Sequence, residues 1–392
     1  MNGATSDFDR APAYVTAAYL FAISMLPGAI APAFIGAAAG TLSLDEAQLG
    51  LFIGSYFLGF GLSSASAYLW IREVNWRASS IIGIVVMSAT FLALGHLVRL
   101  PALLCLMLAN GAGAGLLGSP AITVVGDMTR PERGFSTIIV VSVACSAILL
   151  AFLPLVDQSA GFRGVTTVMA GITLTCLLLV PLVPAGNFVR APAARSTSVE
   201  AGETGSRACS SRLPLLALGV MVLFTLGFIG MWAFFERVAT HAKLMPAAIG
   251  QALAVGTLVG AVGGPLATYM QRRIPMRYCI GITVAAIVIT LCSLTAFSLT
   301  SFRYLCLVCS FQCWANVGIC LIMSLTAAVD RVGRFVALIP ASETIGAAAG
   351  PMITGIVLQS VGLSAMVVFT IGVFFISAAF FAYVDRNKPA FA

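Results

Sequence analysis

One acidic residue, Glu343, stands inside an otherwise uncharged stretch of the sequence, residues 335–384. Counted from Phe335 at about 1.5 Å per residue, its carboxyl group lies roughly 12 Å along a helix. An ionised acid at the centre of a membrane helix costs on the order of 2.5–3.5 kcal/mol, so such a residue usually has a function. We expect Glu343 to bind and release a proton. The alternative is a neutral acid bonded to a neighbouring helix.

Amide and aromatic side chains in other apolar stretches are candidates for binding an organic molecule. Gln312 and Asn316 lie four residues apart and so share one face of a helix. Buried amides need hydrogen-bond partners, which a solute or a neighbouring helix can supply. Trp232 and Tyr56 carry a polar atom on a large apolar ring. The predicted solute-binding residues are Asn110, Gln312, Asn316, Trp232, Tyr56 and Tyr19.

Charged residues gather where apolar stretches end, and some are arranged to pair. Two matching loops, one in each half of the chain, carry both signs of charge, so they can attract each other when they approach. The predicted gating residues are Asp127, Arg130, Arg133, Asp330, Arg334, Arg272 and Arg273. Glu236 and Arg237 are a further acidic and basic pair. We interpret them either as a gate or as a solvated ion pair at the membrane–water interface.

The composition requires a membrane. Sixty per cent of the residues are apolar, nine per cent are charged and the mean hydropathy is +1.03, which leaves too little polar surface to cover a water-soluble protein. About 20 apolar residues span a bilayer as a helix. The uncharged stretches are 11–44, 47–71, 78–98, 100–126, 135–156, 164–189, 213–235, 244–271, 278–302 and 304–329, and residues 335–384 divide at 359–362 into two further helices.

The positions of the basic residues predict the orientation. If both termini are cytoplasmic, the inner segments hold 16 of the 21 Lys and Arg residues. The net charge of +7 then belongs to loops beside anionic lipid headgroups, and no nucleic-acid partner is needed to explain it. We expect an integral protein of a bacterial inner membrane.

A polar segment divides these twelve predicted helices into two sets of six. Residues 185–212 are rich in Ala, Ser, Gly and Arg, which is typical of a mobile linker. Residues 1–184 and 213–392 would then form two six-helix bundles. Short patterns repeat between the two parts about 200 residues apart, as in carriers built from internal repeats.

Several of these patterns resemble the major facilitator superfamily. Residues 111–115 read Gly-Ala-Gly-Ala-Gly, and 127–134 read Asp-Met-Thr-Arg-Pro-Glu-Arg-Gly, similar to the family's fourth helix and the following loop. Residues 264–273 resemble its loop between helices 8 and 9, although Thr268 replaces the usual Asp. The matching loop after helix 2 is eroded, with Ile71 at the Asp position. The resemblance implies an all-α membrane fold of two pseudo-symmetric six-helix bundles, with helices 1, 4, 7 and 10 around a central cavity.

The resemblance implies a secondary transporter that works by alternating access. We prefer proton-coupled symport of a small organic solute, because residues 147–154 lack the Gly-Pro motif of many family antiporters. Proton-driven efflux of a drug-like or secreted compound is the alternative. A membrane sensor or channel is the alternative from a different functional class. An enzyme is not expected, since the chain has only two histidines and no reactive cluster. We expect no cofactor or metal, and a monomer in contact with lipid, solute and protons.

Overall fold

The computed structural model describes residues 11–128, 131–184, 212–296, 298–330 and 335–388. Within these ranges the chain is helical and contains no β-strand. Nearly all of the predicted linker, as well as Arg130 and Arg334, lies outside the described residues.

Six α-helices, of which α2 is short, form the first half of the molecule. Its helices are α1 (Ala11–Ala29), α2 (Ala31–Leu42), α3 (Glu46–Trp70), α4 (Trp76–Leu94), α5 (Leu100–Gly126) and α6 (Pro131–Leu179), followed by the short η2 (Val180–Leu182). We call this part the N-half.

The second half repeats this arrangement and is called the C-half. Its helices are α7 (Arg212–Ala233), α8 (Phe235–His241), α9 (Pro246–Gly260), α10 (Gly263–Arg273), α11 (Met276–Ala296), α12 (Ser301–Val329), α13 (Ile339–Val361) and α14 (Leu363–Asn387), with the short η3 (Val336–Leu338) before α13.

The described helices cross the membrane twelve times, which confirms the predicted fold. Eleven helical stretches are long and apolar enough to span a bilayer, and two of them join α7 to α8 and α9 to α10. One of them, α6, is 49 residues long and reverses direction at Gly161, so it supplies two crossings. Gly161 has φ of +62°, a conformation that glycine adopts without a steric penalty. The fifth and sixth predicted helices are therefore joined through this glycine rather than by a loop.

Two predicted spans are broken into two helices each, and the predicted seventh span, 213–235, is extended beyond a break by the short helix α8. The first divides at Ile30, where Pro27 precedes the break and Pro32 begins α2; proline has no N–H for the helix ladder. The seventh divides at Phe234 and the eighth between Gly260 and Gly263. The first and seventh spans occupy equivalent places in the two halves, so their breaks follow the internal repeat.

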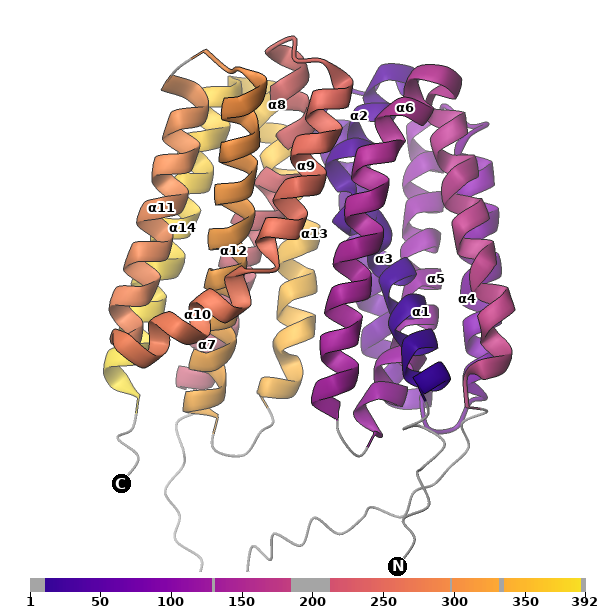
Figure 1. Cartoon of the computed structure of the whole chain (residues 1–392), viewed down its shortest axis with the longest axis horizontal. Helices are drawn as coiled ribbons and strands as arrows, with labels where there is room; N and C mark the ends of the chain where they lie inside the picture. The colour runs from indigo at the N-terminus through magenta and orange to yellow at the C-terminus, as the bar shows by residue number, and fades with distance from the viewer. Residues whose placement is uncertain (1–10, 129–130, 185–211, 297, 331–334, 389–392) are drawn as a thin grey trace, which may run out of the picture.

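The two halves stand side by side with their long helices upright (Figure 1). We call the end where α1 begins and α14 ends the termini end, and the end that carries α2 and α8 the distal end. Contacts between the halves join α3 to α13, α6 to α9, and α2 to α7 and α8. Glycines permit close approach there: Gly50 of α3 faces the carbonyl of Pro351, and Gly250 of α9 faces the carbonyl of Leu150.

Each half has a core of aromatic side chains. In the N-half, the Phe34 ring lies 5.7 Å from Phe52 and 5.5 Å from Phe162. In the C-half, Phe235 and Phe311 lie 4.9 Å apart. All five rings are fully or almost fully buried. These clusters hold the helices of each half together, so each half has a core of its own.

Within the N-half, Gly111 is where α5 and α3 come closest. A Cβ atom added there would overlap the carbonyl oxygen of Tyr56. We therefore expect Gly111→Ala to lower the free energy of unfolding by about 1–3 kcal/mol, the usual cost of overpacking. Unfolding by SDS titration in detergent micelles measures it. Gly281→Ala on α11 is the control, because a Cβ there meets open space; an equal loss in both variants would contradict the packing argument.

Candidate functional site

Glu343 lies near the start of α13 with its side chain exposed. Ile345, which is 59% exposed, follows two residues later and therefore points roughly 160° away around the helix. Ile345 and Ile356 form an apolar exposed side of α13, as expected of a surface that contacts lipid. Glu343 is exposed on a different side.

Helices of both halves flank Glu343. The Thr344 methyl group lies against Gly61 of α3, and Gly346 lies against Thr225 of α7. Successive residues of an α-helix are about 100° apart around its axis. Seen down the axis of α13, Glu343 therefore lies roughly 100° from Thr344 on one side and roughly 60° from Gly346 on the other, between these two contacts. The carboxyl group is therefore directed to the interior between the halves, opposite the lipid-facing side marked by Ile345.

The neighbouring surface of α3 is aromatic. Phe57 and Phe60 are half-buried and lie between the residues of α3 that touch α5 and those that touch α13. The Phe60 ring stacks on Tyr56 at 6.5 Å. On the next turn the Ser64 hydroxyl is buried and has no hydrogen-bond partner among the described atoms. This side of α3 thus offers apolar rings and an unused hydroxyl group.

Both predicted tyrosines hold helices together. The buried Tyr56 hydroxyl donates to the carbonyl of Ser24, which ties α3 to α1. The Tyr19 hydroxyl lies 2.8 Å from Thr175 Oγ1, which ties α1 to α6. Neither oxygen is directed to the side of α13 that carries Glu343.

The three predicted amides lie at contacts between helices. Asn110 is fully buried, and its Nδ2 donates to Thr90 Oγ1 at 2.8 Å and to the carbonyl of Met87 at 3.2 Å. It therefore joins α5 to α4. Gln312 and Asn316 share one face of α12, as predicted, and this face meets Gly260 of α9.

Two of these amides keep an unpaired oxygen atom. Asn316 donates back to the carbonyl of Gln312 at 2.8 Å. Gln312 Oε1 and Asn110 Oδ1, in contrast, are buried without a hydrogen-bond partner among the described atoms. A buried polar atom left unpaired is costly, so these two oxygens are the amide atoms still able to accept a hydrogen bond.

Trp232 joins the two halves. Its indole Nε1 donates to the carbonyl of Ala29 at 3.2 Å, from the end of α7 to the end of α1. Both residues stand where a span breaks, next to Ile30 and Phe234. The indole ring therefore closes the space between the halves on its distal side.

At the termini end, the described gating residues bond within their own half or face solvent. Asp127 accepts two hydrogen bonds from Arg72, at 2.6 and 3.0 Å, and this bonding raises the pKa of Arg72. Asp330 accepts from the backbone of Phe335 and Val336. The remaining described members, Arg133, Arg272 and Arg273, are exposed.

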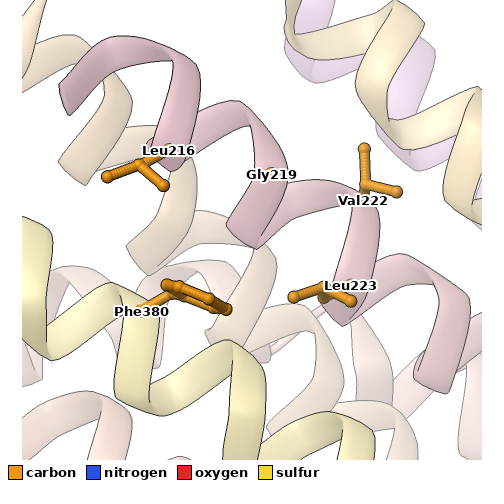
Figure 2. Close-up of a pocket in the computed structure, with 5 residues that line it drawn as sticks. All are labelled: Leu216, Gly219, Val222, Leu223 and Phe380. Carbon is orange, nitrogen blue, oxygen red and sulfur yellow. The ribbon is translucent and has the colours of Figure 1, made fainter. Parts of the chain in front are cut away.

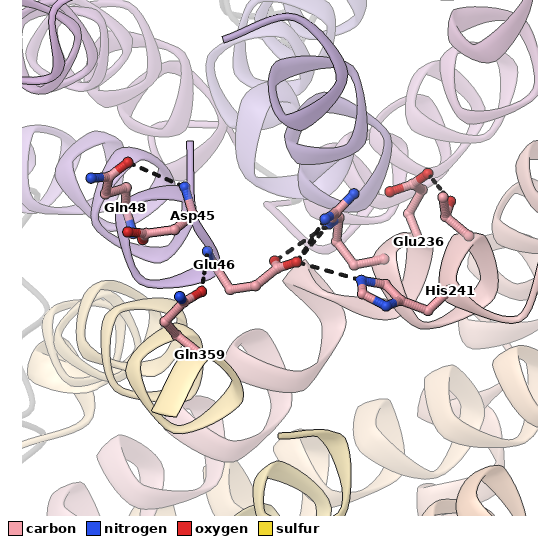
Figure 3. Close-up of polar contacts among 8 residues, drawn as sticks. Asp45, Glu46, Gln48, Glu236, His241 and Gln359 are labelled. Atoms are coloured by element: carbon pink, nitrogen blue, oxygen red, sulfur yellow. Dashed lines mark hydrogen bonds and ion pairs between the residues drawn. The ribbon is translucent and has the colours of Figure 1, made fainter. Parts of the chain in front are cut away.

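A polar cluster at the distal end connects the halves (Figure 3). The guanidinium of Arg237 on α8 bonds to Glu46 on α3, with 2.7 Å from Nη2 to Oε1. His241 Nε2 lies 3.6 Å from the same oxygen. From α13, Gln359 accepts the backbone N–H of Glu46 at 3.1 Å. Side chains of α8 and α13 thus converge on one residue of α3.

The sequence analysis missed this pair, because Glu46 precedes Arg237 by 191 residues. A local signal for the position of Glu46 was present. Asp45 and Gln48 form a capping box, which starts α3 and puts Glu46 in its first turn. The partner of Arg237 required the tertiary structure.

A separate surface pocket of about 370 Å³ lies between α7 and α14 (Figure 2). Its lining is apolar and comprises Leu216, Gly219, Val222, Leu223 and Phe380. Figure 2 shows Phe380 facing the two leucines across the gap. The pocket contains no group able to bind a proton or a polar solute, so it is distinct from the site around Glu343.

Comparison with known proteins identifies the type of molecule. A sequence model described as Major Facilitator Superfamily matches residues 13–339. No curated protein matches the chain in sequence.

Solved transporter structures have a similar fold. The D-xylose-proton symporter superposes with a TM-score of 0.74 at 14% identity, over 96% of this chain and 97% of the other. The nucleoside transporter NupG gives 0.73 at 12% identity, over 97% and 100%. A bacterial homolog of the human lysosomal transporter Spinster, inward-facing and unoccupied, gives 0.71 at 15% identity, over 96% of each chain. At these identities the likeness shows the fold alone.

The Glu46–Arg237 pair should contribute more to stability than the Arg72–Asp127 pair. Its side chains are 13% and 21% exposed, whereas Arg72 is 54% exposed, and solvent weakens exposed pairs. A double-mutant cycle with Glu46→Ala and Arg237→Ala should give a coupling free energy of about 1–3 kcal/mol. The matched cycle at Arg72 and Asp127 should give about 0–1 kcal/mol. SDS unfolding in micelles measures both, and equal couplings would refute the distal pair's role.

Proposed function

This chain belongs to the Major Facilitator Superfamily and is a transporter, and we propose that it moves a small organic solute across the membrane by alternating access. The halves would rock so that the interior opens first at one end and then at the other. The contacts around Glu46, Arg237 and Trp232 support this proposal, since they join the halves at the distal end.

The observation that carries the proposal is the position of Glu343. Its side chain is exposed between the contacts that α13 makes with α3 and α7, while the Glu46–Arg237 salt bridge joins the halves at the distal end. A carboxyl group reached from one end at a time can take up a proton on one side and release it on the other. We therefore assign proton coupling to Glu343, with protons and solute moving together as symport.

The charges of the interior favour a neutral solute. In the described helices, Arg and Lys residues stand near helix ends or, as Arg163 does, beside the reversal of α6, and we place Glu343 at the solute path. An anion would meet a carboxyl group with no cation beside it, which is unfavourable in a low-dielectric interior. Nucleosides and pentoses are suitable first probes, because structurally similar transporters are named for them.

The residues expected to bind the solute remain a proposal. Gln312 and Asn110 are foremost, because the buried Gln312 Oε1 and Asn110 Oδ1 are unpaired among the described atoms. Trp232 would cap the solute from the distal side. Asn316, Tyr19 and Tyr56 would position these helices, since their polar atoms bond to neighbouring backbone or side chains.

The orientation and the inner gate are inferred from the basic loops. We assign the termini end to the cytoplasm of a bacterial inner membrane and the distal end to the outside. The inner gate would form when Asp127, Arg133 and Asp330 approach each other across the halves. Arg130, Arg334, Arg272 and Arg273 complete the proposed set.

Replacing Glu343 tests proton coupling. Solutes that bind the protein are first identified by the increase that they cause in its melting temperature. The protein is then reconstituted into vesicles containing a pH-sensitive dye, and these solutes are added outside. Symport predicts that solute entry acidifies the lumen, whereas proton-driven efflux run in reverse predicts alkalinisation. In Glu343→Gln, which cannot ionise, we expect the pH change to fall to that of protein-free vesicles while exchange of labelled for unlabelled solute continues.

Glu73→Gln is the matched control, because Glu73 is an exposed carboxylate outside the helices. It should retain the full pH change. A full pH change in Glu343→Gln would reject the assignment of coupling to this residue. Solute flux that does not saturate and shows no exchange would reject a carrier in favour of a channel.

A further inference from the structure

A second carboxyl group, that of Glu236, lies inside the distal closure. It projects from α8 toward α2, where a Cβ atom added to Gly36 would collide with the carboxyl group. Its Oε1 accepts the Thr240 hydroxyl at 2.6 Å (Figure 3). Its Oε2 is buried and has no hydrogen-bond partner among the described atoms. The closed distal end therefore leaves half of this carboxyl group without water or a donor.

The neighbouring arginine does not compensate for this burial. Arg237 follows Glu236 directly, but its Nε and Nη2 both bond to Glu46, at 3.0 and 2.7 Å. His241 also lies next to Glu46. Both basic side chains of α8 are thus directed to α3, and among the described contacts neither is hydrogen-bonded to Glu236.

The other charged groups near Glu236 disfavour its ionised form. Glu46 of α3 and Asp157 of α6 are both acids and repel a carboxylate there. Tyr304 of α12 interacts with Glu236 but donates its hydroxyl to the carbonyl of Phe235. On its own helix, Arg237 is the favourable charge and Thr240 the favourable donor. Burying an anion in such a place is costly, whereas burying a neutral acid costs much less.

We propose that Glu236 is a second proton-binding residue of this transporter, and that the halves close at the distal end only when Glu236 is protonated. When the halves separate there, water reaches the carboxyl group and it ionises. The closed and open distal ends then differ by one proton at this site, so a low pH outside favours closure. This inference rests on alternating access, but not on the coupling role of Glu343.

Distances between spin labels at the distal end test the inference. Labels are attached to Ser43→Cys and Ala242→Cys, which are exposed positions in opposite halves, after the ten native cysteines are replaced. Spectra are recorded in nanodiscs from about pH 4 to about pH 9, a range that extends from the pKa of an exposed glutamate, about 4.3, to that of a deeply buried one, about 8–9. We expect short distances at low pH and a growing population of long distances as the pH rises.

Glu236→Gln imitates the protonated acid and should abolish this shift, so that short distances persist at every pH. Thr240→Val removes the hydroxyl donor that stabilises the ionised form, and should move the midpoint of the shift to higher pH. Because Thr240 is exposed, this variant keeps the test valid if Glu236→Gln does not fold. A shift that survives unchanged in either variant overturns the inference.

Two controls identify the titrating group. Asp157→Asn and His241→Gln each remove another titratable group nearby, and both should retain a pH-dependent shift. Loss of the shift in His241→Gln alone would assign it to the histidine and overturn the inference. If long distances between the labels never form and the vesicle assay shows no solute-driven proton movement, the proposal of alternating access itself is refuted. If the vesicle assay shows proton movement but the pH-dependent change in label distance does not depend on Glu236, only the second proton site is refuted.

Discussion

The absence of water from the bilayer core is the constraint on which this structure depends. A polar group there must bond within the protein or face an interior that water can enter. Many hydroxyl groups follow the first course, as Thr225 and Thr370 do by bonding to carbonyls of their own helices. Glu343 is exposed near the start of α13. Glu236 follows neither completely, since one of its oxygens is buried and unpaired among the described atoms.

Much of the fold could be predicted from the sequence, because lipid imposes simple requirements on composition and length. The uncharged stretches correspond to spans, and the family resemblance is confirmed. The sequence did not predict that the first and seventh spans break at Ile30 and Phe234. The first break lies within a continuous apolar stretch, where only Pro27 and Pro32 hinted at it. The second lies at the end of the apolar stretch 213–235, and α8 continues from it with the charged residues Glu236 and Arg237. Hydropathy records apolar character, and it does not record where a helix is interrupted.

The functional residues were less predictable, and the reason differs among them. Glu343 could be singled out because it is the one charge in a long apolar stretch of the sequence, and its coupling role stays a prediction. Amides such as Asn110 have the same appearance in the sequence whether they bind a solute or a neighbouring helix. The partner of Arg237 could not be found, because the contact with Glu46 joins distant parts of the chain across the interface. Pairing across two halves depends on how they dock, which no local pattern encodes.

The breaks in the first and seventh spans affect how the distal end can move. Each leaves a short terminal rod, α2 or α8, joined to a long shaft by one or a few residues. The two rods contact each other, and α8 carries both Arg237 and Glu236. Phe34 of α2 and Phe235 of α8 belong to the aromatic cores of the two halves. Any opening of the distal end that pivots these rods must therefore repack the aromatic core of the same half.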